Sequence, residues 1–338
     1  MSEIWKTEGF FIGDDDYRER MDGEVADFIR DHVTHEYMMA ADGLSLSYYY
    51  ALPEESKGTV VIEHGFCEFF EKLAEMVYYY YRAGFAVFLL EARGHGASER
   101  VFKDMDPDMV YVASFDDYVR DFHDFTEKVV KEKSGKRPLM AFGHSMGGCI
   151  VARTLEDYPD LFDRALLSSP MMSLDWGGLP MPLVYAAILR ADLLRKDKTY
   201  LPGQHGFDDV VTWPKSSMKS KVRYDHMFEC REKVPGNRCY GGCYAWGKAS
   251  LHGMKTCVKR AEKIRTPVLM LTAGQDHMVT AEGQEKFLKR CRTAEHRVFP
   301  ESGHEIYNAT PAERAEYYDM ILTYFSKPAR VKFFSDMG

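Results

Sequence analysis

The fold is decided by residues 139–158, which read LMAFGHSMGGCIVARTLEDY. Leu139–Phe142 is a short apolar run of strand-like composition, and Met146–Tyr158 has the length and composition of a helix. Between them, Gly143-His144-Ser145-Met146-Gly147 is a glycine-flanked serine, the composition of a sharp turn. The stretch therefore predicts a strand, a tight turn with a serine at its apex, and a helix.

Outside this stretch, short apolar runs that end in turn residues alternate with helix-length segments. The predicted strands are Thr59–Glu63, Phe85–Leu90, Leu139–Phe142, Ala165–Leu167, Val268–Leu271 and Arg297–Phe299. The predicted helices are Glu68–Ala83, Phe115–Lys131, Ser145–Tyr158, Ala281–Arg290 and Pro311–Phe325. Alternation of continuous apolar strands with helices is typical of a mostly parallel, doubly wound α/β sheet with helices on both faces.

One region departs from this alternation. Between Met171 and Lys263 no strand pattern recurs, and the sequence is richer in Met, Trp, Gly, Pro and charge. We expect a mainly helical lid at 171–263 inserted into a core formed by 1–170 and 264–338. A second small domain with no part in the site is the alternative interpretation.

Composition excludes several classes of protein. The 338 residues are 45% hydrophobic and 28% charged, which is ordinary for a globular domain and unlike a disordered chain. The net charge of −8 gives no global basic footprint for nucleic acid and no long-range attraction to anionic membranes. No signal peptide or membrane span is recognisable, and the seven cysteines form no C-x-x-C pair. We therefore expect reduced cysteines and a cytoplasmic location.

The glycine-flanked serine carries the first chemical signal. G-x-S-x-G between a strand and a helix is the pattern of a nucleophile elbow, which lifts the serine oxygen above the sheet edge. A serine hydroxyl needs a neighbouring base, and the base needs an orienting carboxylate, in the chain order Ser, acid, His. His304, in the loop after the last predicted strand, is the preferred base, with His277 and His296 as alternatives. Asp276, directly after another strand, is the preferred acid.

A serine nucleophile also needs donors for the oxyanion of the tetrahedral intermediate. We expect the backbone N–H of Met146, the residue after the nucleophile, to be one of them. The second should come from the loop after an earlier strand, where Phe66 is the candidate. We interpret His64 as holding that loop by hydrogen bonds and not as a proton-transfer group.

Five motifs together resemble the α/β-hydrolase superfamily, and within it the monoacylglycerol lipase and lysophospholipase L2-like group. They are HGFCE (64–68), EARGHGAS (91–98), GHSMGG (143–148), AGQDHMV (273–279) and ESGHEIYNA (301–309). The resemblance spans roughly Phe10–Phe325 and implies the α/β-hydrolase fold with a lid over an acyl-chain tunnel. It implies a catalytic triad of Ser145, Asp276 and His304, with oxyanion donors at Phe66 and Met146. Glu91, Lys72 and Leu73 depart from the residues most usual in the group, and Phe66 is larger.

The predicted function is hydrolysis of carboxylic esters that carry one fatty acyl chain, such as lysophospholipids or monoacylglycerols. Within the lid, an apolar stripe would meet the acyl chain, because methionine adapts to chains of variable length. The residues predicted to bind substrate are Met171, Met172, Trp176, Met181 and Tyr185. The same stripe could instead be the packing face of the lid against the core. We expect at most transient contact with a membrane surface, through the lid.

Two other functions fit the same motifs. The triad alone does not separate lipid esters from short or aromatic esters, thioesters or amides, and a non-catalytic binding protein of this fold is a third possibility. No cofactor and no metal is expected, because Cys230, Cys239 and Cys243 have no zinc-site spacing. Cys67 and Cys149 flank the predicted site in sequence, and we interpret them as small buried residues.

Overall fold

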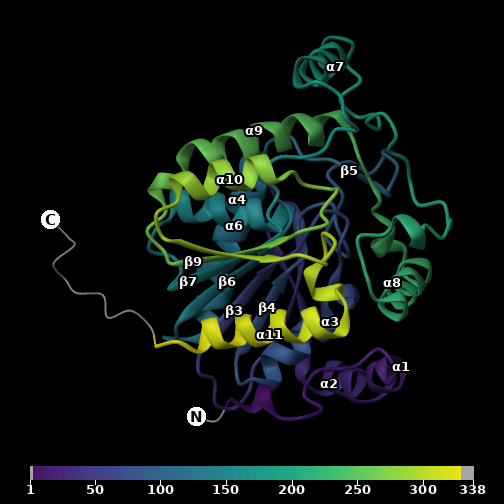
Figure 1. The fold of residues 1–338 in the computed structure, drawn as a ribbon. Coiled ribbons are helices and arrows are strands. Elements are labelled where there is room, and N and C mark those ends of the chain that lie inside the picture. Colours follow the sequence, from purple (N-terminus) through teal and green to yellow (C-terminus); the bar gives the residue numbers. More distant parts are fainter. Residues whose placement is uncertain (1–2, 329–338) are drawn as a thin grey trace, which may run out of the picture.

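The computed structural model describes residues 3–328 and contains one eight-stranded sheet in the order β1-β2-β4-β3-β6-β7-β9-β10 (Figure 1). Six neighbouring strands run parallel, in the order β4, β3, β6, β7, β9 and β10. Strand β2 pairs antiparallel with β4, and β1 pairs antiparallel with β2. The strands are β1 Val33–Met39, β2 Ser45–Ala51, β3 Thr59–Glu63, β4 Ala86–Leu90, β6 Leu139–His144, β7 Arg164–Ser168, β9 Val268–Ala273 and β10 Ala294–Phe299. The doubly wound α/β prediction is confirmed.

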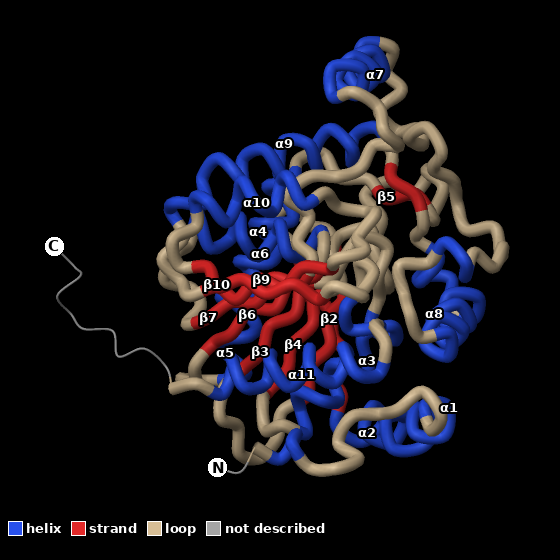
Figure 2. The backbone as a smooth tube through the Cα atoms, in the orientation of Figure 1, coloured by secondary structure: helices blue, strands red, loops and turns tan. Residues whose placement is uncertain are grey.

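Helices cover both faces of this sheet (Figure 2). The helices are α1 Tyr17–Arg20, α2 Ala26–His32, α3 Phe70–Arg82, α4 Phe115–Phe125, α5 Lys131–Ser134, α6 Met146–Asp157, α7 Met181–Leu193, α8 Lys221–Lys233, α9 Tyr244–Arg260, α10 Ala281–Arg290 and α11 Pro311–Ser326. Every predicted strand and helix is confirmed, with ends shifted by three residues or fewer except where the segment 115–131 continues from α4 into a π-helical turn, Thr126–Val130. No helix among residues 3–328 is both long and apolar enough to cross a membrane.

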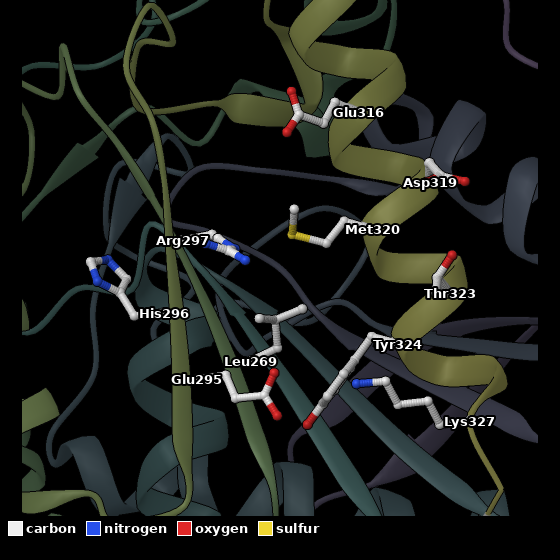
Figure 3. Close-up of a pocket in the computed structure, with 10 residues that line it drawn as sticks. All are labelled: Leu269, Glu295, His296, Arg297, Glu316, Asp319, Met320, Thr323, Tyr324 and Lys327. Carbon is white, nitrogen blue, oxygen red and sulfur yellow. The ribbon is translucent and has the colours of Figure 1, made fainter.

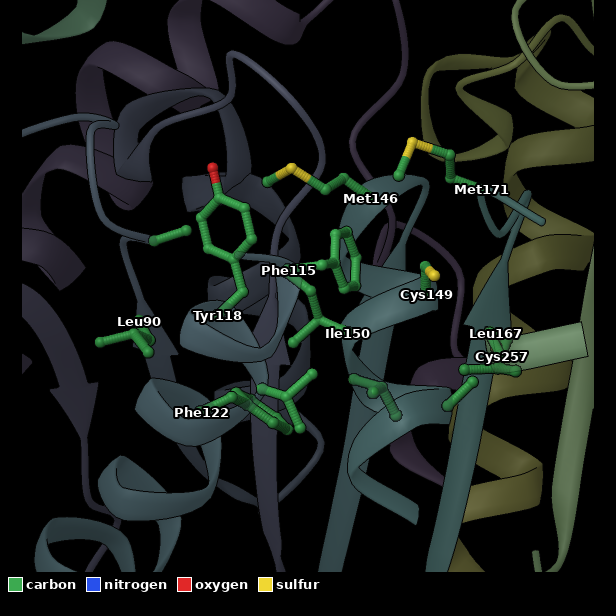
Figure 4. Close-up of a cluster of buried hydrophobic side chains, with 14 of the residues drawn as sticks. Leu90, Phe115, Tyr118, Phe122, Met146, Cys149, Ile150, Leu167, Met171 and Cys257 are labelled. Atoms are coloured by element: carbon green, nitrogen blue, oxygen red, sulfur yellow. The ribbon is translucent and has the colours of Figure 1, made fainter. Parts of the chain in front are cut away.

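The core lies on the two faces of the sheet because successive strand residues point to opposite sides. In β3, Val61 packs with the helices α4, α6 and α9, whereas Val60 and Ile62 pack with α3 and α11. Figure 4 shows the first of these clusters, in which Phe115 and Phe122 of α4 meet Ile150 of α6. Two apolar layers therefore fix the sheet between its helices.

The region from 171 to 263 contains α7, α8 and α9. Helix α9 packs on α4, α6 and α10 in the helical layer over the sheet, whereas α7 projects away from it (Figure 1). The region also contains one short strand that the sequence did not indicate, β8 Gly241–Gly242, which pairs with β5 Met109–Val110. Two residues are too few to produce a strand pattern in the sequence. The boundaries of a lid at 171–263 stay a prediction.

Candidate active site

Ser145 occupies the turn between β6 and α6 in a strained conformation. Its φ of 52° and ψ of −116° lie in a region that residues other than glycine seldom adopt. The backbone holds it there: its N–H donates to the Ser168 carbonyl at 3.0 Å, and its own carbonyl accepts from the Met171 N–H at 2.8 Å. The serine is therefore presented at the carboxyl edge of the sheet.

The glycines on either side of Ser145 are required by space. A Cβ on Gly143 would lie 2.5 Å from the carbonyl oxygen of Gly147, and a Cβ on Gly147 would lie 2.5 Å from the carbonyl oxygen of His64. Real Cβ atoms essentially never approach backbone oxygens so closely. The G-x-S-x-G pattern is thus the local condition for α6 to start so close to β6 and β3.

Ser145, His304 and Asp276 form a continuous hydrogen-bonded chain. His304 Nε2 lies 2.8 Å from Ser145 Oγ, and His304 Nδ1 lies 2.7 Å from Asp276 Oδ2. The three residues follow β6, β10 and β9, so parallel strands deliver all of them to one edge of the sheet. All three side chains are buried, which strengthens electrostatic interactions among them.

The Asp276 carboxylate is held in its charged form. Burial alone would raise its pKa, but the hydrogen bond from His304 and the N–H groups of Met278 and Val279 outweigh burial and lower the pKa. Those two N–H groups donate to Asp276 Oδ1 at 2.8 and 3.0 Å. The carboxylate accepts a hydrogen bond from the Nδ1–H of His304, so the lone pair of Nε2 is free to take the serine proton.

The alternative histidines are placed elsewhere. His277 is exposed, and His296 on β10 bonds Thr272 Oγ1 at 2.8 Å through its Nε2. Neither makes a hydrogen bond to Ser145 among the described residues. Of the three histidines considered, the structure brings His304 to the serine.

The loop after β3 lies against the turn that carries Ser145, since a Cβ on Gly65 would lie 2.9 Å from Cδ2 of His144. The role of Phe66 as an oxyanion donor stays a prediction. No hydrogen bond between described residues outside regular helices and strands uses the N–H of Phe66 or Met146. The Phe66 ring packs on Trp246 of α9 at 4.1 Å between ring centroids, which fixes the loop from outside. His64 bonds the Gly65 carbonyl through Nδ1 at 2.7 Å and accepts the Ala92 N–H at 2.9 Å, so its predicted role as a loop holder is confirmed.

A buried group of charges joins this loop to the loop that carries His304. Lys72 Nζ lies 2.9 Å from Glu68 Oε1 and 3.1 Å from Glu305 Oε1. Glu68 also accepts the Gly65 N–H at 2.5 Å through Oε2. Glu305 follows His304 directly, so one ammonium group connects the loop after β3 to the loop that carries His304.

Each charged group here stabilises the charged form of its neighbours. Burial alone would raise the pKa of Glu68 and Glu305. Lys72, together with His144 and the hydrogen bonds from Tyr307 to Glu68 and from Asn308 to Glu305, outweighs burial and lowers both pKa values. Burial alone would lower the pKa of Lys72, and the two carboxylates raise it instead. This group was not predicted from the sequence. The four-residue spacing of Glu68 and Lys72 was visible, but nothing in the sequence showed that their charges are buried together with Glu305.

The five residues predicted to meet the acyl chain do not share one surface. Met171 and Met172 are buried, and Figure 4 shows Met171 in the core cluster near Cys149. Trp176 is partly buried against the same cluster. Met181 and Tyr185 lie on α7 and are 38% and 47% exposed. Their role as substrate contacts stays a prediction.

A pocket of about 660 Å³ lies away from the serine. It is formed between β9, β10 and α11, and Figure 3 shows Leu269, Arg297 and Met320 on its walls. Its lining includes none of the three residues of the hydrogen-bonded chain and is rich in charge. The hydrogen-bonded chain of Ser145, His304 and Asp276 therefore lies outside this pocket.

Comparison with known proteins agrees with this geometry. Residues 54–311 match the Hydrolase_4 family model, described as serine aminopeptidase S33. The match covers most of the chain, so the chain belongs to this α/β-hydrolase family and is a serine hydrolase.

Individual relatives are distant. Lysophospholipase L2 of Escherichia coli strain K12 is 26% identical over 315 residues, covering 91% of this chain and 86% of the relative. Monoacylglycerol lipase of Mycolicibacterium smegmatis is 23% identical over 257 residues, covering 75% and 83%. The structure of a soluble variant of monoglyceride lipase from Saccharomyces cerevisiae matches with a TM-score of 0.70 at 19% identity, covering 88% of this chain and 96% of that one. The resemblance to this group is confirmed as distant homology.

Proposed function

We propose that this serine hydrolase cleaves carboxylic esters that carry a single fatty acyl chain, the ester class of lysophospholipids and monoacylglycerols. The observation that carries the proposal is the chain from Ser145 Oγ through His304 to Asp276, at 2.8 and 2.7 Å. Distant relatives named as lysophospholipase L2 and monoacylglycerol lipase support the lipid class of the substrate.

In the proposed reaction, His304 Nε2 accepts the Ser145 proton while Oγ attacks the ester carbonyl carbon. Asp276 stabilises the imidazolium that forms, through the hydrogen bond at Nδ1. Collapse of the tetrahedral intermediate expels the alkoxide, which takes the proton from His304. Water, activated by the same histidine, then attacks the acyl-enzyme and releases the fatty acid.

The N–H groups of Phe66 and Met146 are the proposed donors to the oxyanion. Met146 is the first residue of α6, so its N–H points from a helix N-terminus, where the helix dipole favours negative charge. Phe66 belongs to the loop that Glu68 ties to the loop that carries His304. Donors fixed before the reaction stabilise the developing charge without reorganisation.

Helix α7 supports an aggregated or membrane-borne lipid as the source of substrate. It stands clear of the sheet (Figure 2), and apolar side chains around it face solvent. They are Leu179, Met181, Leu183, Tyr185, Leu189, Leu193 and Leu194. Exposed apolar patches rimmed by polar residues mark surfaces that bind lipid or protein.

The test combines labelling with turnover. Intact-mass spectrometry after treatment with a fluorophosphonate should give one adduct, absent from Ser145→Ala. Lysophosphatidylcholine, 2-monoacylglycerol and p-nitrophenyl esters from acetate to palmitate should then be compared on the same protein. Ser134→Ala is the control, since this buried serine at the end of α5 has a hydroxyl without a hydrogen-bond partner among residues 3–328.

Long-chain esters should be the better substrates, and Ser145→Ala should release no fatty acid. A best rate on acetate or butyrate esters would move the assignment to a short-acyl esterase, thioesterase or amidase. Full esterase activity in Ser145→Ala would remove the mechanism itself.

A further inference from the structure

Three buried side chains outside the serine site bring metal-binding atoms together. They are Cys67 in the loop after β3, His95 in the loop after β4, and Cys239 shortly before β8. Their ligand atoms all lie within 4.8 Å of one another. His95 and Cys239 have no exposed surface and Cys67 is 7% exposed, so all three residues lie inside the protein.

One ring nitrogen of His95 has no hydrogen-bond partner among the described residues. Its Nδ1 lies 3.1 Å from the Arg93 carbonyl, and because a carbonyl only accepts, the proton is assigned to Nδ1. Nε2 then carries a lone pair, and it has no hydrogen-bond partner among the described residues although it is fully buried. Leaving such an atom unpaired costs free energy, which a ligand would recover.

We propose that Cys67, His95 and Cys239 form a Zn²⁺ site. Thiolate sulfur and imidazole nitrogen are the ligands that zinc takes in proteins, and two thiolates balance the charge of the ion. On binding, each cysteine loses its thiol proton to solvent and donates an electron pair to the metal. The hydrogen bond from Nδ1 to the Arg93 carbonyl is the outer contact that usually orients a ligating histidine.

The spacing of the three atoms suits this ion. With Zn–S bonds of about 2.3 Å and Zn–N bonds of about 2.05 Å, a tetrahedron separates two sulfurs by about 3.8 Å and sulfur from nitrogen by about 3.6 Å. The present limit of 4.8 Å requires the side chains to move inward by an ångström or so at most. The fourth position would be filled by water or another small ligand.

The location gives the ion a structural consequence. Cys67 follows Phe66 directly, and its carbonyl already accepts from Arg231 of α8 at 2.7 Å. Cys239 lies in the segment that leads into β8. A metal ion would therefore cross-link the loop beside Ser145 to the region between α8 and α9.

The sequence expectation that no metal binds rested on cysteine spacing. Cys230, Cys239 and Cys243 were compared because they lie close together in the chain. The proposed ligands are at 67, 95 and 239, and only the fold brings them together.

The test measures metal and does not depend on enzyme activity. Reduced, chelator-treated protein is titrated with Co²⁺ in place of Zn²⁺, and absorbance is recorded. We expect a thiolate-to-cobalt charge-transfer band and the strong visible bands of tetrahedral cobalt, both abolished by one equivalent of Zn²⁺. Zinc content after dialysis should be about one ion per chain.

Variants identify the ligands. Cys67→Ser, Cys239→Ser and His95→Gln should each weaken zinc binding more than the 10- to 100-fold that loss of an outer contact costs. Cys230→Ser is the matched control, because this half-buried cysteine on α8 lies outside the group, and it should bind zinc as the wild type does.

Equal zinc content in all four variants would identify adventitious binding and overturn the proposal. So would a wild-type cobalt spectrum without a thiolate band, which decides the question even if a variant fails to fold. Isolation of the protein in air, without added reductant, with Cys67 and Cys239 joined as a disulfide and no bound zinc would also overturn it, because a disulfide offers no thiolate to a metal.

Discussion

Replacing Lys72 with methionine removes the cation that joins Glu68 in the loop after β3 to Glu305 in the loop that carries His304. Glu68 and Glu305 then remain as two buried carboxylates with no counter-ion at 2.9 and 3.1 Å. Removing one partner of a buried ion pair typically costs 3–5 kcal/mol, because the remaining charge is uncompensated. At about 2.1 cal/mol/K per residue, 338 residues give an unfolding entropy near 0.7 kcal/mol/K, so Tm should fall by about 4–7 °C.

The pH dependence of Lys72→Met follows from the carboxylates. In the wild type Lys72 is the largest of the groups that together lower the pKa of Glu68 and Glu305 below their unfolded values. Both carboxylates therefore stabilise the fold above about pH 4.3, and this stability is lost as pH falls through their folded pKa. Without Lys72, burial dominates and raises both pKa values. The folded variant then gains stability as pH falls through those raised values, so its deficit should be largest near pH 7–8 and shrink towards pH 5.

Thermal and urea unfolding at pH 7.5 and 5.5 measure this effect. Lys128→Met is the matched control, since Lys128 pairs with Asp124 at the same four-residue spacing and 2.8 Å but is 63% exposed. Exposed pairs contribute little, so this variant should stay within about 0.5 kcal/mol of the wild type. The reasoning fails if Lys72→Met is no less stable than Lys128→Met, or if its deficit grows as pH falls.

Three further outcomes are expected. Asp276→Asn should lower kcat by about 10⁴-fold, as the corresponding change does in serine proteases, while fluorophosphonate adds more slowly; near-normal kcat would remove Asp276 from the mechanism. Gly147→Ala should abolish soluble expression or lower Tm strongly, since its Cβ overlaps backbone oxygens after β3, whereas Gly23→Ala, with nothing within 4 Å, should leave Tm unchanged or raise it. Leu189→Asp on α7 should reduce binding to phospholipid vesicles in a flotation assay. Val298→Asp on β10, which also replaces an exposed apolar side chain, should not.

The parallel strands β3, β4, β6, β7 and β9 were predictable because they are buried on both faces, whereas β10 at the sheet edge is mostly exposed and only its last three residues were predicted. Strands buried on both faces read as continuous apolar runs, as in Thr59–Glu63 and Val268–Ala273. The antiparallel pair β1 and β2 was missed because β1, at the sheet edge, is mostly exposed and has no apolar run. The turn at Asp42-Gly43 between them was the available signal, since Asp-Gly between alternating segments favours a hairpin.

The hydrogen-bonded chain of Ser145, His304 and Asp276 was predictable because the residues next to each member in the sequence form a recognisable pattern. Ser145 is flanked by glycines, and Asp276 and His304 each follow a predicted strand closely. The order serine, acid, histidine along the chain is therefore enough to select them without the three-dimensional structure. Lys72, Glu68 and Glu305 have no such pattern around them. Charged residues are rarely fully buried, so sequence alone favours the exposed interpretation for each of them.

Helix α7 shows the opposite limit of sequence reasoning. Its apolar residues, such as Leu189 and Leu193, suggest a face that packs against the rest of the protein. Apolar composition indicates that a surface is unfavourable in water, but it does not identify what covers that surface. In the structure both side chains face solvent, 69% and 82% exposed, while Val184 and Ile188 of the same helix are buried. The helix thus uses one face to pack and leaves the other uncovered. An apolar substrate, or the membrane that holds it, would contact that uncovered face. Vesicle binding by Leu189→Asp therefore tests the proposed lipid class of the substrate as well as the role of the helix.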